Sequence, residues 1–144
     1  MIGWTRRGRV RALADSSCRA LPLLCAAALV VLLARAPLAP RSAAPVMVGA
    51  GYLAALLALW LNRNHPWIPV VLLGAALNAV AILANGGRMP GPEGALPPLS
   101  YVGDILRVDV GGRGAIVSPG DVLMAVGVAG FVQAVMRRPL ERPR

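Results

Sequence analysis

Four long runs of apolar residues alternate with short polar segments along the chain. The runs cover residues 20–38, 46–61, 67–84 and 119–136, and none has an ionised residue at its middle. Each approaches the ~20 residues that an α-helix needs to cross a hydrocarbon core. A surface helix of a soluble protein would show a polar face, which these runs lack. The pattern therefore predicts an all-α integral membrane protein with about four transmembrane helices in a compact bundle.

The polar segments define the expected domain organisation. We expect one membrane domain over residues 20–136, between an Arg-rich N-terminal segment at 1–19 and an Arg-rich tail at 137–144. Residues 85–118 form a long connection for so small a domain, and long connections often have a function of their own. This segment is predicted to be a loop that caps the outer end of the bundle.

The charge distribution predicts the orientation. The net charge is +9, from 15 basic residues, all of them Arg, against 6 acids. Basic residues concentrate beside the cytoplasmic ends of membrane helices. An N-terminus on the inside places ten arginines on the inner side: Arg6, Arg7, Arg9, Arg11, Arg19, Arg63, Arg137, Arg138, Arg142 and Arg144. The outer side then holds five: Arg35, Arg41, Arg88, Arg107 and Arg113.

This membrane topology predicts a protein of the cell (inner) membrane with both termini cytoplasmic. Trp60 and Trp67 would lie together at the inner interface, where indole rings are common. Arginine clusters beside membrane helices attract anionic lipid head groups, which we expect as partners of the inner face. Because topology and lipid account for the basic charge, nucleic acid is not an expected partner.

The first run has a second interpretation as a signal peptide. An Arg-rich start, an apolar stretch and Ala34-Arg35-Ala36 match the general pattern of a cleavable signal. Pro37 follows at once and disfavours cleavage, so we favour a retained helix. An intact mass lacking residues 1–36 would establish the signal peptide instead.

Small residues in the runs predict close helix packing, which drives association where lipid is as apolar as leucine. The expected packing positions are Ala50, Ala54 and Ala58 with Gly51 and Ala55 in the second run, Gly74 in the third, and Gly127, Gly130 and Ala134 in the fourth.

Asn78 is the strongly polar residue deep in the third run. An unpaired amide is costly in lipid, so Asn78 is expected to face another helix. We favour an interhelical hydrogen bond, with Gln133 as a candidate partner type, over ligand binding.

The ends of the outer segment carry helix-boundary signals. Asn85-Gly86-Gly87 predicts a left-handed C-terminal cap. Ser118-Pro119-Gly120-Asp121 predicts a capped helix start. The related sequence Gly103-Asp104-Ile105-Leu106 suggests a second, similar entry into a short helix. Residues 105–118 match a small hairpin with a Gly turn.

The polar residues form no recognisable catalytic or metal-binding set. His65 is expected in an inner loop exposed to solvent, a bilayer away from the acids Glu93, Asp104, Asp109 and Asp121, so a Ser-His-acid triad cannot assemble. The acids match no calcium-loop spacing. Cys18 and Cys25 are about 10 Å apart along a helix, too far for a disulfide.

A transport function would need ionisable groups within the membrane, and no run holds one at its middle. We therefore predict no catalytic, cofactor-binding or metal-binding residues, no cofactor and no enzymatic activity.

Three motifs in order resemble a known family. The stretches are Leu73–Pro90 with its ANGG-x-MP motif, Val102–Leu106 with a GD motif, and Ser118–Gly127, where S-x-GD opens the last helix. Together they resemble the bacterial domain-of-unknown-function family 5317 of small multi-pass membrane proteins, over about the C-terminal half of the chain. Relatives often begin with an additional hydrophobic segment, which the Arg-rich N-terminus here lacks.

The resemblance implies no activity and no catalytic residues. It singles out eight positions as candidates for a polar or motif site: Asn78, Asn85, Gly86, Gly87, Met89, Pro90, Asp104 and Asp121.

The expected function is a non-enzymatic accessory or interaction component of the cell membrane, with a membrane-protein partner or a second copy of the chain as partner. The alternative is a small-molecule or ion binding or transport protein with an outer polar site at Asn85, Asp104 and Asp121. A membrane enzyme is the third interpretation.

Overall fold

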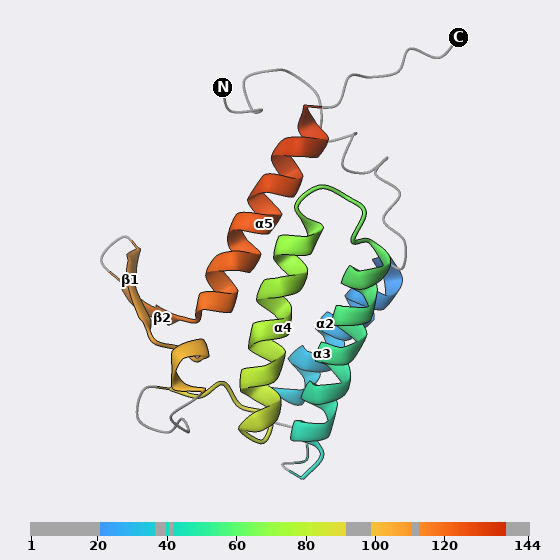
Figure 1. Cartoon of the computed structure of the whole chain (residues 1–144). Coiled ribbons are helices and arrows are strands. Elements are labelled where there is room, and N and C mark those ends of the chain that lie inside the picture. The colour runs from blue at the N-terminus through green and yellow to red at the C-terminus, as the bar shows by residue number, and fades with distance from the viewer. Residues whose placement is uncertain (1–20, 37–39, 41, 92–98, 111–112, 138–144) are drawn as a thin grey trace.

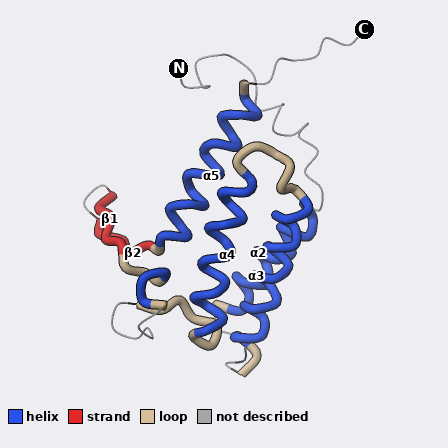
Figure 2. Tube along the Cα trace, viewed as in Figure 1, coloured by secondary structure: helices blue, strands red, loops and turns tan. Residues whose placement is uncertain are grey.

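Four helices dominate the part of the chain that the computed structural model describes, which is residues 21–36, 40, 42–91, 99–110 and 113–137. The elements are α2 (Leu21–Ala34), α3 (Ala44–Leu61), α4 (Ile68–Ala84), the short 3-10 helix η2 (Ser100–Val102), the strands β1 (Leu106–Val110) and β2 (Arg113–Val117), and α5 (Pro119–Met136). Figure 2 shows the two strands standing beside an otherwise helical bundle.

Helices that follow one another in the sequence also pack against one another. α2 packs on α3, α3 on α4, and α4 on α5, so α2 and α5 lie at the two edges of the bundle. The chain alternates in direction (Figure 1). The end of α2, the start of α3 and the end of α4 lie at one end, and the start of α5 with the hairpin lies beside the middle of α4. This part of the molecule, from the middle of α4 to that end, is called the hairpin end below. The loop at 62–67 and the end of α5 lie at the opposite end.

The helix bounds differ little from those predicted, except at α2. That helix ends at Ala34, four residues before the predicted end at 38, and a turn through Arg35 and Ala36 follows it. Pro37 disfavours helical conformation in the residue before it, which explains the early end. The predictions for residues 1–20, including Cys18 and the signal peptide, and for the tail at 138–144 lie outside the described residues.

Two of the four helices are long and apolar enough to cross a membrane. α3 and α5 each have 18 residues, which corresponds to about 27 Å at a rise of about 1.5 Å per residue. α2 and α4 are apolar but shorter, with 14 and 17 residues. By length and composition, the structure thus has two membrane-spanning candidates in its described part, against the four predicted.

Glycine allows close approach of α2 and α3 at one of the predicted packing positions, Gly51. Ala50 is exposed, whereas Gly51 is buried against α2. A Cβ at Gly51 would lie 2.6 Å from Val31 Cγ2 and 3.1 Å from the carbonyl oxygen of Ala27. The predicted packing positions Gly51 and Ala58 are thus buried, and the prediction is wrong for Ala50.

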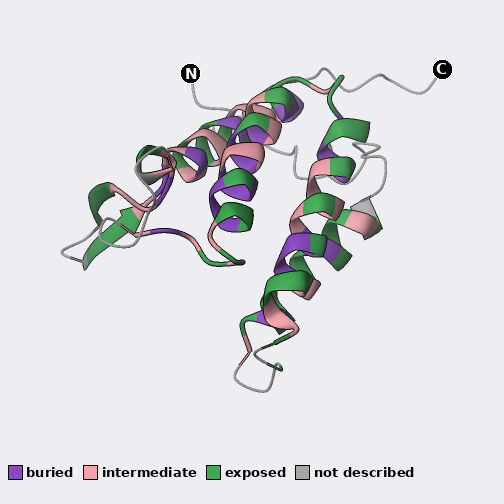
Figure 3. Cartoon of the chain, turned by 60° about the horizontal axis from the view of Figure 1, so that its bottom comes forward, coloured by how far each residue is buried: buried purple, intermediate pink, exposed green. Residues whose placement is uncertain are grey.

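The predicted glycines of α4 and α5 do lie where these two helices meet. A Cβ at Gly74 would lie 2.5 Å from the carbonyl oxygen of Gly120, and a Cβ at Gly127 would lie 2.8 Å from the backbone nitrogen of Val71. Gly130 lies under the ring of Trp67. Buried residues form stripes along the helices, and exposed residues cover much of the remaining helical surface (Figure 3).

The hairpin is antiparallel and pairs Leu106 with Val117 through to Val110 with Arg113. The hairpin prediction is thus confirmed, with its connecting residues 111–112 outside the described residues. The first GD motif leads into β1, so the predicted second helix entry is wrong. Valines alternate with polar residues after Ile105, a pattern that favours a strand over a helix.

The loop at the opposite end is ordered by ring contacts. The guanidinium of Arg63 lies 4.3 Å from the ring centre of Trp60, and it also donates a hydrogen bond to the Trp60 carbonyl. His65 contacts Phe131 edge to face, with ring centres 6.3 Å apart. His65 is therefore partly buried on α5, which corrects the expectation of a solvent-exposed loop residue.

Candidate functional site

A closed ring of hydrogen bonds connects α4 to the first turn of α5. The Asn78 amide nitrogen donates to Asp121 Oδ1 over 2.7 Å, and Ser118 Oγ donates to Asn78 Oδ1 over 2.8 Å. Asn78 is 2% exposed and Ser118 is fully buried. The prediction that Asn78 faces another helix is confirmed, with Ser118 and Asp121 as its partners in place of Gln133.

The α5 half of this ring is a capping box. The backbone N–H of Asp121 donates to Ser118 Oγ over 3.0 Å, and the backbone N–H of Ser118 donates to Asp121 Oδ2 over 3.1 Å. Pro119 occupies the first helical turn, as predicted. Capping satisfies N–H groups that a helix start leaves without intrahelical partners. Asp121 thus uses one carboxylate oxygen for its own helix and the other for α4.

The ring closes because glycine lets the two helices touch. A Cβ on Gly120 would overlap the Asn78 side-chain oxygen, and it would lie 2.6 Å from the carbonyl oxygen of Gly74. Only a residue without a side chain fits between Asn78 and Gly74. We call Asn78, Ser118 and Asp121, with Gly74 and Gly120 beside them, the α4–α5 lock.

A second group of charged residues lies near the lock. Asp104 follows η2, and its backbone N–H donates to the carbonyl of Pro90 over 2.9 Å. Burial raises the pKa of the Asp104 carboxyl above its ordinary value, and the negative charge of Asp121 raises it further, whereas Arg35 acts in the opposite direction. Tyr52 of α3 lies within electrostatic range of all three charged groups. The hairpin end therefore brings together charges from both edges of the bundle.

The remaining motif residues shape the turn after α4. The Asn85 side chain donates to the carbonyl of Ala81 over 2.7 Å, so it caps its own helix. Gly86 and Gly87 have φ of 64° and 87°, the left-handed conformation that the predicted cap requires. The N–H of Gly87 donates to the carbonyl of Ile82 over 2.9 Å.

Met89 and Pro90 attach this turn to the bundle. Met89 packs on the apolar cluster of Ala34, Val48 and Ile82, which joins α2, α3 and α4. Pro90 is buried and lies against Gly103. The segment from Asn85 to Pro90 therefore closes the hairpin end of the bundle.

The structure brings only some of the predicted site residues together. Asn78 and Asp121 are hydrogen bonded, and Asp104 lies within electrostatic range of Asp121. Asn85 is directed at its own helix, so the predicted trio of Asn85, Asp104 and Asp121 does not converge as one site. Within the described residues there is no group of three His, Cys, Asp or Glu side chains that could hold a metal ion.

Sequence reasoning overlooked Ser118 as a partner of Asn78, and it overlooked Arg35 and Tyr52. The helix-start signal assigns the Ser118 hydroxyl only to its cap, although an N-cap hydroxyl can donate outward while it accepts from the helix. Along the sequence, Arg35 is only a charge that flanks an apolar run. Its proximity to Asp104 requires the long-range packing of α2 beside the segment after α4, which no local pattern contains.

Comparison with known proteins places the chain in a family and leaves its activity open. No curated protein and no solved structure matches it. A family of unknown function matches residues 12–97, more than half of the chain. This range corrects the expected coverage, because it contains the ANGG-x-MP motif but ends before both GD motifs. The chain belongs to the family of unknown function DUF5317.

Proposed function

We propose that the chain is a multi-pass protein of the cell membrane and acts there as a non-enzymatic accessory or interaction component. The observation that carries this proposal is the exposure of its apolar helices. Only 28% of the α3 span and 17% of the α5 span are buried, although both spans are strongly apolar. The core helix of a soluble protein would be mostly buried. Helices that are apolar but exposed are suited to a lipid environment.

The shorter helices support the same proposal. Large apolar side chains of α2 and α4 are also exposed, among them Leu29, Leu32, Leu73 and Val80. Soluble monomers rarely expose contiguous apolar surface on this scale. We therefore propose that all four described helices are embedded.

The proposed orientation places both chain termini in the cytoplasm and the hairpin end outside. The arginine distribution along the sequence supports it. Trp60 and Trp67 flank the loop at the opposite end and are 53% and 45% exposed. Indole rings are enriched at membrane–water interfaces, so these positions suit a loop at the inner interface. The same loop holds the Arg63 guanidinium over Trp60.

The accessory role is supported by how the motif residues are used. Asn78 and Asp121 bond to each other, Asn85 bonds to its own helix, and Met89 packs in an apolar cluster. These contacts hold the fold together and leave the side chains with little freedom for chemistry. The hairpin stands away from the helices and exposes Val108 and Ile116, which offers a surface for a protein partner outside the membrane.

In vivo photo-crosslinking tests the interaction role. A photoreactive residue at Ile116 on the hairpin is compared with one at Leu57 on α3, since the two side chains are 48% and 53% exposed. We expect the probe at Ile116 to give an adduct with one protein, of the same mass in repeated experiments, and the probe at Leu57 to give lipid adducts. Lipid adducts alone from both positions would contradict a partner at the hairpin.

Small-molecule or ion binding at the hairpin end is the second candidate function. Two acidic groups close to each other, Asp104 and Asp121, favour it, and so does the raised pKa of Asp104. A membrane-impermeant carboxylate reagent that modifies Asp104, and is blocked by a specific cation, would support this candidate.

A further inference from the structure

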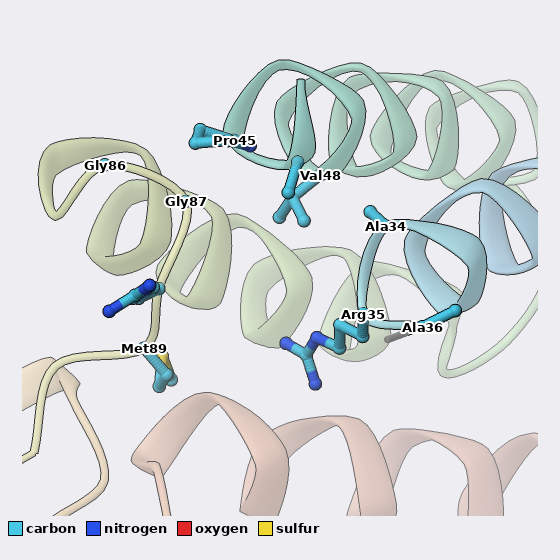
Figure 4. A pocket seen from close by; sticks show the side chains of 10 residues that line it. Ala34, Arg35, Ala36, Pro45, Val48, Gly86, Gly87 and Met89 are labelled. Atoms are coloured by element: carbon cyan, nitrogen blue, oxygen red, sulfur yellow. The ribbon is translucent and has the colours of Figure 1, made fainter. Parts of the chain in front are cut away.

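A pocket of about 620 Å³ opens at the hairpin end, between the end of α2, the start of α3 and the turn after α4. Its volume lies within the roughly 300–1,000 Å³ of small-molecule sites. Figure 4 shows Ala34, Val48 and Gly87 around the opening, with the Arg35 side chain extending from the end of α2 toward the side where Met89 lies. The pocket is separate from the α4–α5 lock, whose hydrogen-bonded side chains do not line it.

The charge of the pocket is entirely positive. Its lining includes two guanidinium groups, Arg35 and Arg88, and no carboxylate. Both arginines are exposed, and neither forms an ion pair within the part of the chain that the structure describes. Asp104 lies within electrostatic range of Arg35 but does not line the pocket. The two positive charges are thus available to an external anion.

The backbone around the pocket adds to this preference. Ala44 and Pro45, the first two residues of α3, line it, and no side chain caps this helix start. The N–H of Ala44 already donates to the carbonyl of Pro40 over 3.1 Å and Pro45 has no N–H, so α3 contributes the positive end of its helix dipole and no backbone donor from these two residues. The two arginines and the start of α3 therefore act on the same space.

Glycine lets two walls of the pocket, the turn after α4 and the start of α3, pack together. A Cβ on Gly87 would lie 2.7 Å from the Cα of Pro45, and a Cβ on Gly86 would meet nothing within 4 Å. Both glycines line the pocket with backbone alone. The glycine pair of the family motif therefore caps α4, and Gly87 lets the turn after α4 pack closely against the start of α3.

We propose that this pocket binds the phosphate group of a phosphate ester. Guanidinium groups donate parallel pairs of N–H bonds, which match phosphate oxygens. A phosphate group has two free oxygens in a diester and three in a monoester, each with several lone pairs, so it can accept from Arg35 and Arg88 together. The lining holds no group that would repel an anion.

The same chemistry has two sources, a lipid head group and a free phosphate ester. The lipid source rests on the proposed membrane location, because the ends of embedded helices lie at the depth of lipid phosphates. The free ester does not depend on that location. An experiment can therefore distinguish a pocket that binds no phosphate from a chain that is not embedded in the membrane.

The test uses the purified full-length chain in a non-ionic detergent. Its thermal midpoint is measured against dioctanoyl phosphatidylglycerol, dioctanoylglycerol and sn-glycerol 3-phosphate. The first probe has chains and phosphate, the second chains alone, and the third phosphate alone. Each is titrated into wild type, Arg35→Gln, Arg88→Gln and the control Arg107→Gln, which removes an exposed arginine on β1 outside the pocket.

We expect phosphatidylglycerol to raise the midpoint of wild type. Loss of either pocket arginine should weaken apparent binding about tenfold or more, since each supplies charge-assisted hydrogen bonds. Arg107→Gln should change binding by less than about twofold, as expected for a charge that touches no ligand. Stabilisation by glycerol 3-phosphate with the same arginine dependence would identify a free ester, and stabilisation by the lipid alone would identify a head group.

Two results would overturn the proposal. Dioctanoylglycerol could stabilise the protein as well as phosphatidylglycerol, which would show that chains bind and phosphate does not. Alternatively, Arg107→Gln could weaken binding as much as Arg35→Gln, which would show diffuse attraction to a basic surface. If Arg35→Gln does not fold, Arg88→Gln and Arg88→Lys provide the same comparison at an exposed position after α4.

Discussion

Exchanging Asn78 and Asp121 tests whether the hydrogen bonds of the α4–α5 lock hold the two helices together. In Asp121→Asn, one of the two accepting carboxylate oxygens becomes an N–H₂ group. That group then faces either the Asn78 amide or the Ser118 backbone N–H, and both of these are donors. The two bonds concerned are 2.7 and 3.1 Å long and both go to a charged acceptor, so the substitution loses one of them and replaces the charged acceptor of the other with a neutral one. Each charged hydrogen bond is worth about 1.5–3 kcal/mol in water-soluble proteins, and roughly 0.6–1.7 kcal/mol is measured between membrane helices. We expect Asp121→Asn to lower the free energy of unfolding by about 2 kcal/mol.

Asn78→Asp is expected to be worse, because it sets two carboxylates against each other at a position that is 2% exposed. The double variant restores a complementary set. The amide introduced by Asp121→Asn can donate to the carboxylate introduced by Asn78→Asp and still accept from the Ser118 N–H. Ser118 Oγ can donate to that same carboxylate. The double variant should therefore be more stable than Asn78→Asp alone.

Recovery should be incomplete. The exchange moves the negative charge away from the first turn of α5, where the helix dipole favours it by about 0.3–1 kcal/mol. Reversible unfolding in mixed micelles, or the thermal midpoint in detergent, gives the coupling energy from the four proteins. Asp104→Asn is the matched control, since it makes the same change at the same end outside the lock. Additive losses in the double variant would refute the lock, and so would full stability of Asp121→Asn.

Three further substitutions test the close approach of the helices, the turn after α4 and the charge beside the lock. Gly74→Ala places a methyl 2.5 Å from the Gly120 carbonyl oxygen and should cost about 1–3 kcal/mol in thermal unfolding; an unchanged midpoint would contradict the close approach. Gly87→Ala should destabilise more than Gly86→Ala by about 1 kcal/mol or more, because both are strained at positive φ but only Gly87 meets α3; equal losses would argue against that contact. The raised pKa of Asp104 means that its ionised form is disfavoured in the fold, so its contribution to stability is present below the ordinary pKa of 3.8 and is lost as pH rises through the folded pKa. Asp104→Asn should remove this pH dependence and leave stability at pH 7 equal or slightly higher, and a clear loss at pH 7 would contradict the sign.

Local sequence patterns were sufficient to predict the features that depend on residues adjacent in sequence. The capping box of Ser118 and Asp121 and the left-handed turn at Gly86 and Gly87 were both predicted. Such features follow from the conformational limits of a few adjacent residues. The hairpin over residues 106–117 belongs to the same group, because alternation and a Gly pair are local signals.

Long-range pairing could not be predicted in the same way. The need for a partner of Asn78 followed from the cost of a buried amide, but the choice of Asp121 depended on where α5 starts relative to α4. Apolar patterning around a helix also did not decide between Ala50 and Gly51 as the packing position. The Arg35 and Arg88 pocket arises from three segments that are distant in sequence, so charge counting alone could assign these arginines only to the outer side.

Thiol accessibility tests the central claim, that the chain spans the membrane with its hairpin end outside. Cys18 and Cys25 are replaced by Ala, and single cysteines are introduced at Tyr101, which is 76% exposed beside the hairpin, and at Asn64 in the loop at the opposite end. A membrane-impermeant maleimide is applied to intact spheroplasts and again after permeabilisation. We predict labelling of the Tyr101→Cys variant before permeabilisation and of Asn64→Cys only afterwards. Labelling in the reverse order, or recovery of the protein in the soluble fraction, would contradict the account.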